Sequence, residues 1–309
     1  MRRHIYFVHE GKAAYPEIDA YKRFFASDYE VEDLFPDQLA TKNDLAESVC
    51  WLMMGYYPAP ILAKVVIHDY RSLSVGRLGL LKDRMKRWRN AKPSLRIFQN
   101  EAIRDAMGFT DGVPGLLLPM GVPESILSHR RAAGSGEPLC DFCYIGVMSS
   151  ERRSEQMFES FLRRFGNRKT LYLYGEPEVA IRQAYDKHAN IVFRGKMPQE
   201  QLFEEIVRAK AAVNYFPTHR PHLMQTPTKM LEYGALGLRI LSNEQPQSRR
   251  TAQVYGIQSL WGPAHDIFRN VPDDISWPDN QSFDPSPLMW PVIIRQSGIA
   301  DYLKKELGA

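Results

Sequence analysis

Short apolar runs alternate with amphipathic stretches along most of this chain, and this pattern constrains the fold more than any other feature. A short apolar run followed by a helical repeat is typical of βαβ units, which build parallel sheets. In the first half we expect strands at residues 5–9, 30–35, 49–54, 64–68, 95–99 and 115–119. Helices are expected at residues 17–26, directly after Pro16, and at residues 78–89.

The pattern is interrupted at residues 130–138, RRAAGSGEP, where small and turn-forming residues replace the apolar repeat. It resumes with expected strands at 142–146, 170–174, 191–194, 211–216 and 238–241, and helices at 155–165, 179–188, 199–209, 227–236 and 299–307. The sequence therefore predicts an α/β protein with two Rossmann-like, doubly wound domains. Their expected ranges are residues 1–130 and 138–290, with a final segment, 291–309, that returns to the first domain. Ligands of such sheets bind at the carboxyl ends of the strands, so we expect a site in a cleft where the domains face each other.

Composition is typical of a globular protein, with 309 residues of which 44% are hydrophobic and 25% charged. The N-terminus lacks the apolar region of a signal peptide, and no apolar run approaches the roughly 18 residues of a membrane span. We therefore expect a cytoplasmic protein whose membrane contact, if any, is peripheral. Cys140 and Cys143 have no second pair or histidine at zinc spacing, so we interpret them as ordinary buried thiols.

The formal net charge of +4 is distributed unevenly. The expected helix at 78–89 places Leu78, Leu81, Met85 and Trp88 on one stripe. The basic residues in and around it are Arg71, Arg77, Lys82, Arg84, Lys86, Arg87, Arg89, Lys92 and Arg96. An apolar stripe bordered by cations suits the headgroup region of an anionic membrane. A helix whose stripe packs into the core of the first domain is an equal alternative.

The segment 225–243, QTPTKMLEYGALGLRILSN, carries the clearest chemical signal. Thr226 is expected to cap a helix that has Pro227 at its first position and ends before Gly237. The amides of Thr228 and Lys229 then form a site for a diphosphate. Glu232 lies about one turn along the helix, where its carboxylate can meet ribose hydroxyls. A solvent-exposed glutamate on an ordinary crossover helix is the alternative.

The run PTKMLEYGALG at residues 227–237 resembles the donor-binding helix of GT-B glycosyltransferases, especially retaining glycosyltransferase family 4. YIGVMSSERRSEQMFESF from Tyr144, IVFRGKMPQEQLFEEI from Ile191 and NYFP at 214–217 resemble that family in order and spacing, and LLLPMGVP at 116–123 resembles the end of its acceptor domain. The resemblance implies a GT-B fold and transfer of a sugar, with retention, from a nucleoside diphosphate-sugar to a glycan or glycolipid hydroxyl. It places this activity in surface polysaccharide or lipopolysaccharide synthesis, with no metal and no other cofactor.

The resemblance also implies roles for individual residues. Arg153 matches the basic residue that neutralises the donor diphosphate, and Glu232 matches the ribose-binding glutamate. The chain departs from the family at Val147 and Met224, where an arginine and a first glutamate are usual, and Arg152 and Arg220 are candidates to replace their charges. The expected donor-binding residues are Gly11, Arg152, Arg153, Gly195, Arg220, Thr226, Thr228, Lys229 and Glu232.

Acceptor contacts are expected from the first domain. His68 ends the expected strand 64–68 and Asp69 follows it, so His68 should stand at the rim of the cleft and bond a sugar hydroxyl in either protonation state. A histidine that caps the strand is the alternative. The expected acceptor-binding residues are Glu10, Lys12, His68, Asp69 and Arg71, and the expected catalytic residues are His68, Arg153 and Glu232.

Other functions fit parts of the sequence. His219-x-x-His222 is not expected to bind a metal, because Pro221 breaks the helix that would align the rings and no carboxylate is adjacent in sequence. Nucleic-acid binding is not expected without aromatic stacking platforms or a known module. A nucleotide-sugar-binding protein without transferase activity and a GT-B nucleotide-sugar epimerase remain as alternatives.

Overall fold

The computed structural model describes residues 2–11, 15–53, 55–130 and 136–308. These residues form two compact units. The first contains the described residues up to Gly121, the short segment Met224–Thr226, and the chain from Met289 onward. The second contains Val122–Leu223 and Pro227–Leu288. The first unit thus ends before the predicted break at 130–138. It also includes the C-terminal segment from Met289 onward.

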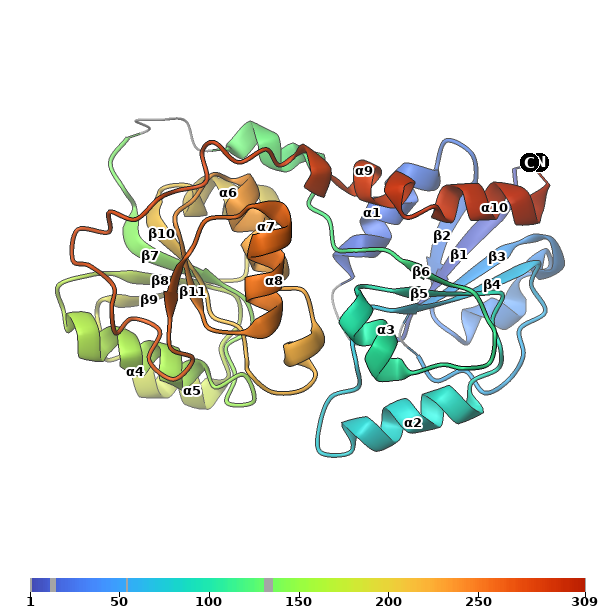
Figure 1. The fold of residues 1–309 in the computed structure, drawn as a ribbon, viewed down its shortest axis with the longest axis horizontal. Helices are drawn as coiled ribbons and strands as arrows, with labels where there is room; N and C mark the ends of the chain where they lie inside the picture. Colours follow the sequence, from blue (N-terminus) through green and yellow to red (C-terminus); the bar gives the residue numbers. More distant parts are fainter. Residues whose placement is uncertain (1, 12–14, 54, 131–135, 309) are drawn as a thin grey trace. The chain divides into compact units, whose positions relative to one another are not determined.

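The first unit is built on a six-stranded, fully parallel sheet with the order β2-β1-β3-β4-β5-β6 (Figure 1). All five residues of β3, VCWLM, are buried, as expected for a central parallel strand covered on both faces. The strands are β1 His4–Val8, β2 Glu30–Leu34, β3 Val49–Met53, β4 Val65–Tyr70, β5 Leu95–Phe98 and β6 Gly115–Leu117.

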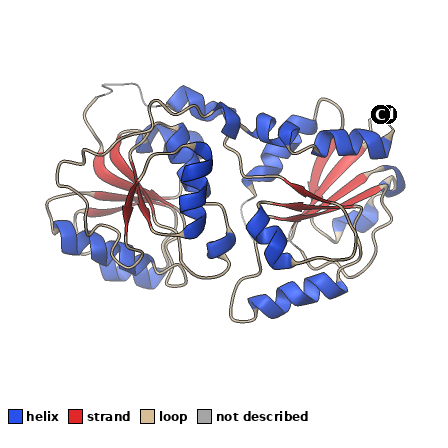
Figure 2. Ribbon diagram, viewed as in Figure 1, coloured by secondary structure: helices blue, strands red, loops and turns tan. Residues whose placement is uncertain are grey.

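Helices lie on both sides of this sheet (Figure 2). The C-terminal helices belong to the first unit because α9 packs against α1, where the Trp290 ring meets Tyr21 edge-on at 5.9 Å. The Tyr302 hydroxyl of α10 donates to the Ser94 carbonyl at 3.1 Å. The helices of this unit are α1 Pro16–Phe25, α2 Gly79–Arg89, α3 Glu101–Met107, α9 Trp290–Gln296 and α10 Ile299–Leu307.

The second unit has its own six-stranded parallel sheet, with the order β12-β11-β10-β7-β8-β9. Aromatic side chains of α4, including Phe158, Phe161 and Phe165, pack with Phe142 of β7 and with Phe268. The elements are β7 Cys140–Ile145, α4 Ser154–Phe165, β8 Leu171–Tyr174, α5 Val179–Tyr185, β9 Ile191–Gly195, α6 Gln199–Ile206, β10 Ala209–Asn214, α7 Thr228–Ala235, β11 Ile240–Asn243, α8 Pro246–Tyr255 and β12 Leu260–Gly262. Short 3-10 helices lie at Gln38–Thr41, Leu45–Glu47, Glu124–His129, His222–Met224 and Ser286–Leu288.

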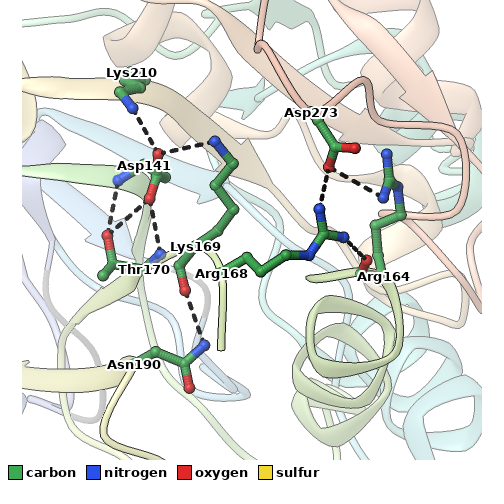
Figure 3. Close-up of polar contacts among 8 residues, drawn as sticks. All are labelled: Asp141, Arg164, Arg168, Lys169, Thr170, Asn190, Lys210 and Asp273. Atoms are coloured by element: carbon green, nitrogen blue, oxygen red, sulfur yellow. Dashed lines mark hydrogen bonds and ion pairs between the residues drawn. The ribbon is translucent and has the colours of Figure 1, made fainter. Parts of the chain in front are cut away.

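A polar network fixes the amino end of this second sheet (Figure 3). Asp141 of β7 accepts from the Lys210 ammonium of β10 at 2.8 Å and from the Thr170 amide at 2.9 Å. Asn190 donates to the Lys169 carbonyl at 2.8 Å, and Asp273 pairs with Arg168 at 3.1 Å. These contacts lie at the end of the sheet opposite the strand termini where ligands of parallel sheets bind, so they position the strands without occupying the site.

None of the helices in the described ranges combines the length and apolar character needed to cross a bilayer. The three cysteines are free and buried, which confirms the prediction of ordinary buried thiols. Burial raises the pKa of the Cys143 thiol well above its usual range, so it stays protonated.

Candidate functional site

In the second unit, the turn between β7 and α4 has an unusual backbone. Gly146 follows β7 with a φ of 138°, and its amide donates to the Tyr174 carbonyl at 2.8 Å. Between β7 and α4 the chain forms a tight turn, in which the Ser149 amide donates to the Ser154 hydroxyl at 3.1 Å. Arg153 then adopts the left-handed conformation, with a φ of 54°. A non-glycine residue in this region carries backbone strain, which is frequent at binding sites.

The helix α7 begins at Thr228, with Pro227 at the capping position and no side-chain cap. The prediction of Thr226 as cap and Pro227 as first helical residue was therefore wrong by one position. The first two helical amides now belong to Thr228 and Lys229, the same pair that the sequence assigned to a diphosphate, and first-turn amides have no acceptor within their own helix. The Tyr233 hydroxyl accepts from the Ile145 amide at 3.0 Å, which fixes α7 against the end of β7.

Lys229 turns its side chain inward, to the carboxyl end of β7. Only 7% of the residue is exposed, its Nζ donates to the Tyr215 carbonyl at 3.3 Å, and it lies 4.0 Å from the centroid of the Tyr144 ring. Burial lowers the pKa of this amine well below its usual range, the charge of Arg152 lowers it further, and Glu232 opposes both. A Cβ on Gly146 would lie 3.4 Å from this Nζ, so the backbone at the end of β7 lies directly beside the amine. The sequence indicated only the Lys229 amide.

Glu232 lies on the same helix, three residues after Lys229. Its carboxylate is half-buried and accepts a long hydrogen bond from Gln199 of α6 at 3.5 Å. Burial raises the pKa of this carboxyl to about 7, against the lowering effects of Lys229 and Gln199. A carboxyl with such a pKa changes protonation state near neutral pH, which is a frequent property of functional groups.

Arg152 and Arg153 differ in their surroundings. Arg152 is half-buried, and its charge acts on both Lys229 and the Tyr144 hydroxyl. Arg153 is exposed, and its charge acts on Tyr215. Arg152 is therefore the cation that acts on Lys229, whereas the resemblance to family 4 implied that Arg153 neutralises the diphosphate. Val147, at the position where an arginine is usual, is 52% exposed.

The remaining predicted donor residues divide between the two units. Gly195 ends β9 with a φ of 76°, and Arg220 lies in the loop after β10, so both belong to the second unit. Gly11, with a φ of 67°, belongs to the first. A Cβ on Gly11 would lie 2.9 Å from the Phe35 ring, so this tight turn excludes larger residues.

Thr226 belongs to the first unit and is held by the start of α3. Its amide donates to the Gln99 side chain at 2.9 Å, and its hydroxyl accepts from Asn100 at 3.2 Å. Asn100 also caps α3 by accepting from the Ile103 amide. Met224, where a glutamate is usual in the family resembled, packs against the apolar cluster of Tyr70, Leu73, Phe98, Ile103 and Met107. These contacts explain why Thr226 does not cap α7.

The first unit contains a cavity of about 430 Å³ at the ends of β1 and β3, covered by α2. Glu10, one of the predicted acceptor residues, lines it. Burial lowers the pKa of the Lys86 amine in its wall, and Asp83 and Glu10 act in the opposite direction. The cavity therefore combines apolar walls with charged groups; its other lining residues are Tyr15, Met53, Gly55, Tyr56, Ser72, Leu73, Ser74, Val75, Lys82 and Met85. Lys12 lies outside the described residues.

His68 does not stand at a rim, because β4 continues to Tyr70 and encloses it within the strand. It is 4% exposed, beside the ring of Tyr57 at 5.9 Å. Burial and, to a smaller extent, the charge of Arg96 lower the pKa of this imidazole to about 4. The histidine is therefore neutral at pH 7 and lies behind other side chains, which argues against direct contact with an acceptor.

Asp69 and Arg71 are also interior groups. Asp69 accepts from the Trp51 indole at 3.0 Å, and Arg71 donates to the Leu118 carbonyl at 2.6 Å. The two side chains lie 3.6 Å apart, and Glu17 lies 3.9 Å from Arg71. Both are at most 3% exposed. Their predicted role in acceptor binding is not supported, because the same extension of β4 places them in the core.

His219 and His222 lie close together, although Pro221 was expected to prevent their rings from aligning. The Leu223 amide donates to the His219 carbonyl at 3.0 Å, which closes a turn and brings the two rings to 5.4 Å. Glu151, distant in sequence, supplies the carboxylate that the sequence lacked nearby: its Oε1 lies 3.0 Å from Nε2 of His219.

Comparison with known proteins identifies the class of fold. No model of a protein family matches the sequence, and no curated protein matches it. Solved structures match over almost the whole chain. The structure of Anabaena Alr3699/HepE in complex with UDP and glucose has a TM-score of 0.67 at 11% identity, covering 98% of this chain and 100% of that chain. AviGT4, a glycosyltransferase involved in avilamycin A biosynthesis, has a TM-score of 0.64 at 14% identity, with 99% of each chain covered.

A UDP-N-acetylglucosamine 2-epimerase also matches, with a TM-score of 0.52 at 10% identity over 99% of this chain and 96% of that chain. The shared property is the fold. The chain has the GT-B architecture of two units, each with a parallel sheet and covering helices, as the sequence predicted.

Proposed function

We propose that this chain is a glycosyltransferase that binds the diphosphate of a nucleoside diphosphate-sugar at the carboxyl end of β7. The observation that carries the proposal is the buried Lys229 amine beneath Gly146, beside Arg152 and the first amides of α7. Burial of the Lys229 ammonium costs free energy, and a bound diphosphate would offset this cost by pairing with its charge. The GT-B neighbours, among them a structure that holds UDP and glucose, support the same ligand class.

The roles of the individual groups follow from their positions. Lys229, the Thr228 amide and Arg152 hold the diphosphate, with Arg153 and Arg220 at its outer side. These donors stabilise the negative charge that develops on the leaving diphosphate, which is how sugar transfer proceeds without a metal in the reaction. Glu232, three residues along α7, accepts from the ribose hydroxyls. Gly195 leaves space at the end of β9.

The acceptor is proposed to enter the cavity of the first unit, which Glu10, Lys82 and Lys86 line with charge and Tyr15 and Tyr56 line with aromatic surface. Sugar rings bind well between aromatic faces and polar side chains. A glycan or glycolipid hydroxyl is therefore the proposed nucleophile, in synthesis of a surface polysaccharide or lipopolysaccharide. The resemblance to family 4 favours a hexosyl donor and retention of the anomeric configuration.

Peripheral membrane contact through α2 is part of this proposal. The residues of the apolar stripe on α2 and its N-terminal flank are exposed, Trp88 by 70%, Leu78 by 61% and Leu81 by 50%, so the stripe is not part of the core. Arg84 and Arg87 flank Trp88 at 5.8 and 5.9 Å from its ring. Aromatic surface beside cations suits the interface of an anionic bilayer.

The epimerase alternative is kept because a UDP-N-acetylglucosamine 2-epimerase shares the fold over nearly the whole chain. The two activities differ in their products. An epimerase interconverts its nucleotide-sugar with no acceptor present, whereas a transferase releases a nucleoside diphosphate and modifies an acceptor.

A panel of nucleoside diphosphate-sugars in a thermal shift assay, followed by transfer of labelled sugar to lipid and glycan extracts, tests the proposal. Binding to the native state raises the melting temperature. We expect one class of donor to do so, and its sugar to appear in an extractable glycan or lipid with the anomeric configuration of the donor. No stabilisation by any donor would overturn the proposal, and a new sugar epimer without acceptor would favour the alternative.

A further inference from the structure

Glu151, His219 and His222 form the one group of three candidate metal ligands found among the described residues. One ligand atom of each lies within 4.8 Å of the others. Glu151 comes from the turn between β7 and α4, and the two histidines come from the loop after β10. All three belong to the second unit, so its own fold assembles the group.

The spacing of the three side chains fits a tetrahedral metal. Zn²⁺ binds imidazole nitrogen and carboxylate oxygen at about 2.0–2.2 Å, which separates neighbouring tetrahedral ligands by about 3.3 Å. In the structure, Oε1 of Glu151 lies 3.0 Å from Nε2 of His219, and its Oε2 lies 3.6 Å from Nε2 of His222. These two distances bracket the expected separation. The imidazole planes cross at 87°, so the two rings approach the carboxylate from different directions.

Backbone contacts hold the ligands in place. The His222 carbonyl accepts from the buried Gln245 side chain at 2.9 Å, and Gln245 in turn caps α8 by accepting from the Ser248 amide at 2.6 Å. On the other side, the Ser150 amide beside Glu151 donates to Glu178 at 3.0 Å. A metal site needs ligands that are positioned before the ion arrives, and both segments satisfy this condition.

The group also has a route for an ion to enter. The Glu151 side chain is 54% exposed, whereas that of His222 is 7% exposed. The site therefore opens to solvent at Glu151 and, with 29% of its side chain exposed, at His219, whereas His222 forms its buried side. Three protein ligands leave one tetrahedral position for water, as in zinc sites whose fourth ligand exchanges.

We propose that Glu151, His219 and His222 bind a divalent transition metal of the zinc class, which fastens the Ser149–Arg153 turn to the loop after β10. Two imidazoles and one carboxylate bind such ions in preference to calcium or magnesium, which favour sites made of oxygen ligands alone. Arg152, Arg153 and Arg220 lie on the two segments that the ion joins, so its structural effect falls on the loops that carry these cations. The metal site does not depend on the proposed function, and the ion takes no part in the sugar transfer proposed above.

Metal binding to the full chain, freed of any histidine tag, tests this inference. We expect equilibrium dialysis to give one Zn²⁺ per chain, and Zn²⁺ to raise the melting temperature. Substitution of Co²⁺ should give the intense visible absorption of a four-coordinate ion. His219→Ala and Glu151→Gln each remove one ligand at an accessible position, so both variants should fold and bind Zn²⁺ at least about tenfold more weakly, since even indirect changes cost 10–100-fold.

His265→Ala provides the matched control, because His265 is an exposed histidine of the same unit. It should bind Zn²⁺ as the unmodified chain does. Absence of stoichiometric Zn²⁺ binding to the unmodified chain would overturn the inference and leave the three residues as an ion-paired cluster. Equal affinity of the His219→Ala and Glu151→Gln variants and the unmodified chain would also overturn it.

Discussion

The Nζ atom of Lys229 lies 4.0 Å from the centroid of the Tyr144 ring, so a helix-borne amine is held against the aromatic face of a residue in β7. This contact compensates part of the charge that burial removes from water. Without a bound anion, the compensation is incomplete, because burial still lowers the pKa of the amine well below its usual range. An anionic ligand, as in the proposed function, would complete this compensation.

Replacing Lys229 should therefore stabilise the protein. Because the folded-state pKa lies below the ordinary value of 10.5, a buried ammonium costs stability at neutral pH, and this cost decreases as the pH rises toward 10.5. We expect Lys229→Met to melt at a higher temperature than the unmodified chain at pH 7, with a difference that narrows toward pH 10. Calorimetric melting with Lys187→Met, an exposed lysine of the same unit, as control checks this. A lower melting temperature for Lys229→Met at pH 7 would mean that the amine is needed for the fold.

Nucleoside binding should depend on pH through Glu232. The pKa of this carboxyl is raised to about 7, so it is mostly ionised at pH 8 and mostly protonated at pH 6. Ionised carboxylate accepts from ribose hydroxyls more strongly, so nucleoside affinity should be up to about tenfold higher at pH 8 than at pH 6. The same raised pKa means that Glu232 costs stability above pH 7 and not below its ordinary value of 4.5.

Titration calorimetry at the two pH values, on the unmodified chain and on Glu232→Gln, measures this effect. The variant should bind the nucleoside weakly and independently of pH over this range. A pH dependence that survives in Glu232→Gln would assign the titration to another group.

Arg71 should contribute to folding and not to ligand binding. It is the cation between the buried carboxylates of Asp69 and Glu17, so Arg71→Met leaves both without it. Removing one partner of a buried ion pair costs about 3–5 kcal/mol. We expect a loss of that order in urea unfolding, and no loss for Arg77→Met, an exposed arginine of the same unit. If Arg71→Met lowers the free energy of unfolding by less than about 1 kcal/mol, Arg71 is not needed for the fold and is again a candidate for the acceptor site.

Binding to anionic membranes should depend on α2. Each basic residue near such a surface contributes about 1 kcal/mol, so Arg84→Ala with Arg89→Ala should weaken binding to phosphatidylglycerol vesicles about 30-fold. Trp88→Ala should weaken it through lost apolar contact. Sedimentation at low and high salt separates the two contributions, because only the first is screened. The double variant Lys304→Ala and Lys305→Ala on α10 is the control. If the unmodified protein does not bind these vesicles, α2 is an ordinary exposed helix.

The sequence predicted all six strands of the first sheet and five of the six strands of the second, because buried strands and amphipathic helices leave regular apolar periods. It missed the edge strand β12, Leu260–Gly262, which is too short to show such a period. Strand ends were less accurate. β4 extends to Tyr70, and since polar residues such as His68 and Asp69 rarely continue a buried strand, the pattern suggested that it stopped earlier. That shift of two residues moved an expected acceptor site into the core.

Residues of the candidate site were predictable where they belong to one continuous segment. The helix that carries Thr228, Lys229 and Glu232 is an example, because its position follows from local signals. The inward turn of the Lys229 side chain was not predictable, since it depends on Tyr144 and Tyr215 from other strands. Glu151 was missed beside His219 for the same reason, as they are 68 residues apart in sequence.

Calorimetric titration of nucleoside diphosphates into the unmodified chain and the Lys229→Met, Arg152→Ala and Arg153→Ala variants tests the central claim most directly. A panel of UDP, GDP, ADP and dTDP covers the bases that the structure does not distinguish. We expect one of them to bind, and Lys229→Met to bind it more weakly by about 1.5–3 kcal/mol, the contribution of a charged hydrogen bond. Arg152→Ala should lose more affinity than Arg153→Ala, and all three variants should keep their affinity for the corresponding nucleoside. Undiminished diphosphate binding by Lys229→Met would contradict the account and place the donor site elsewhere.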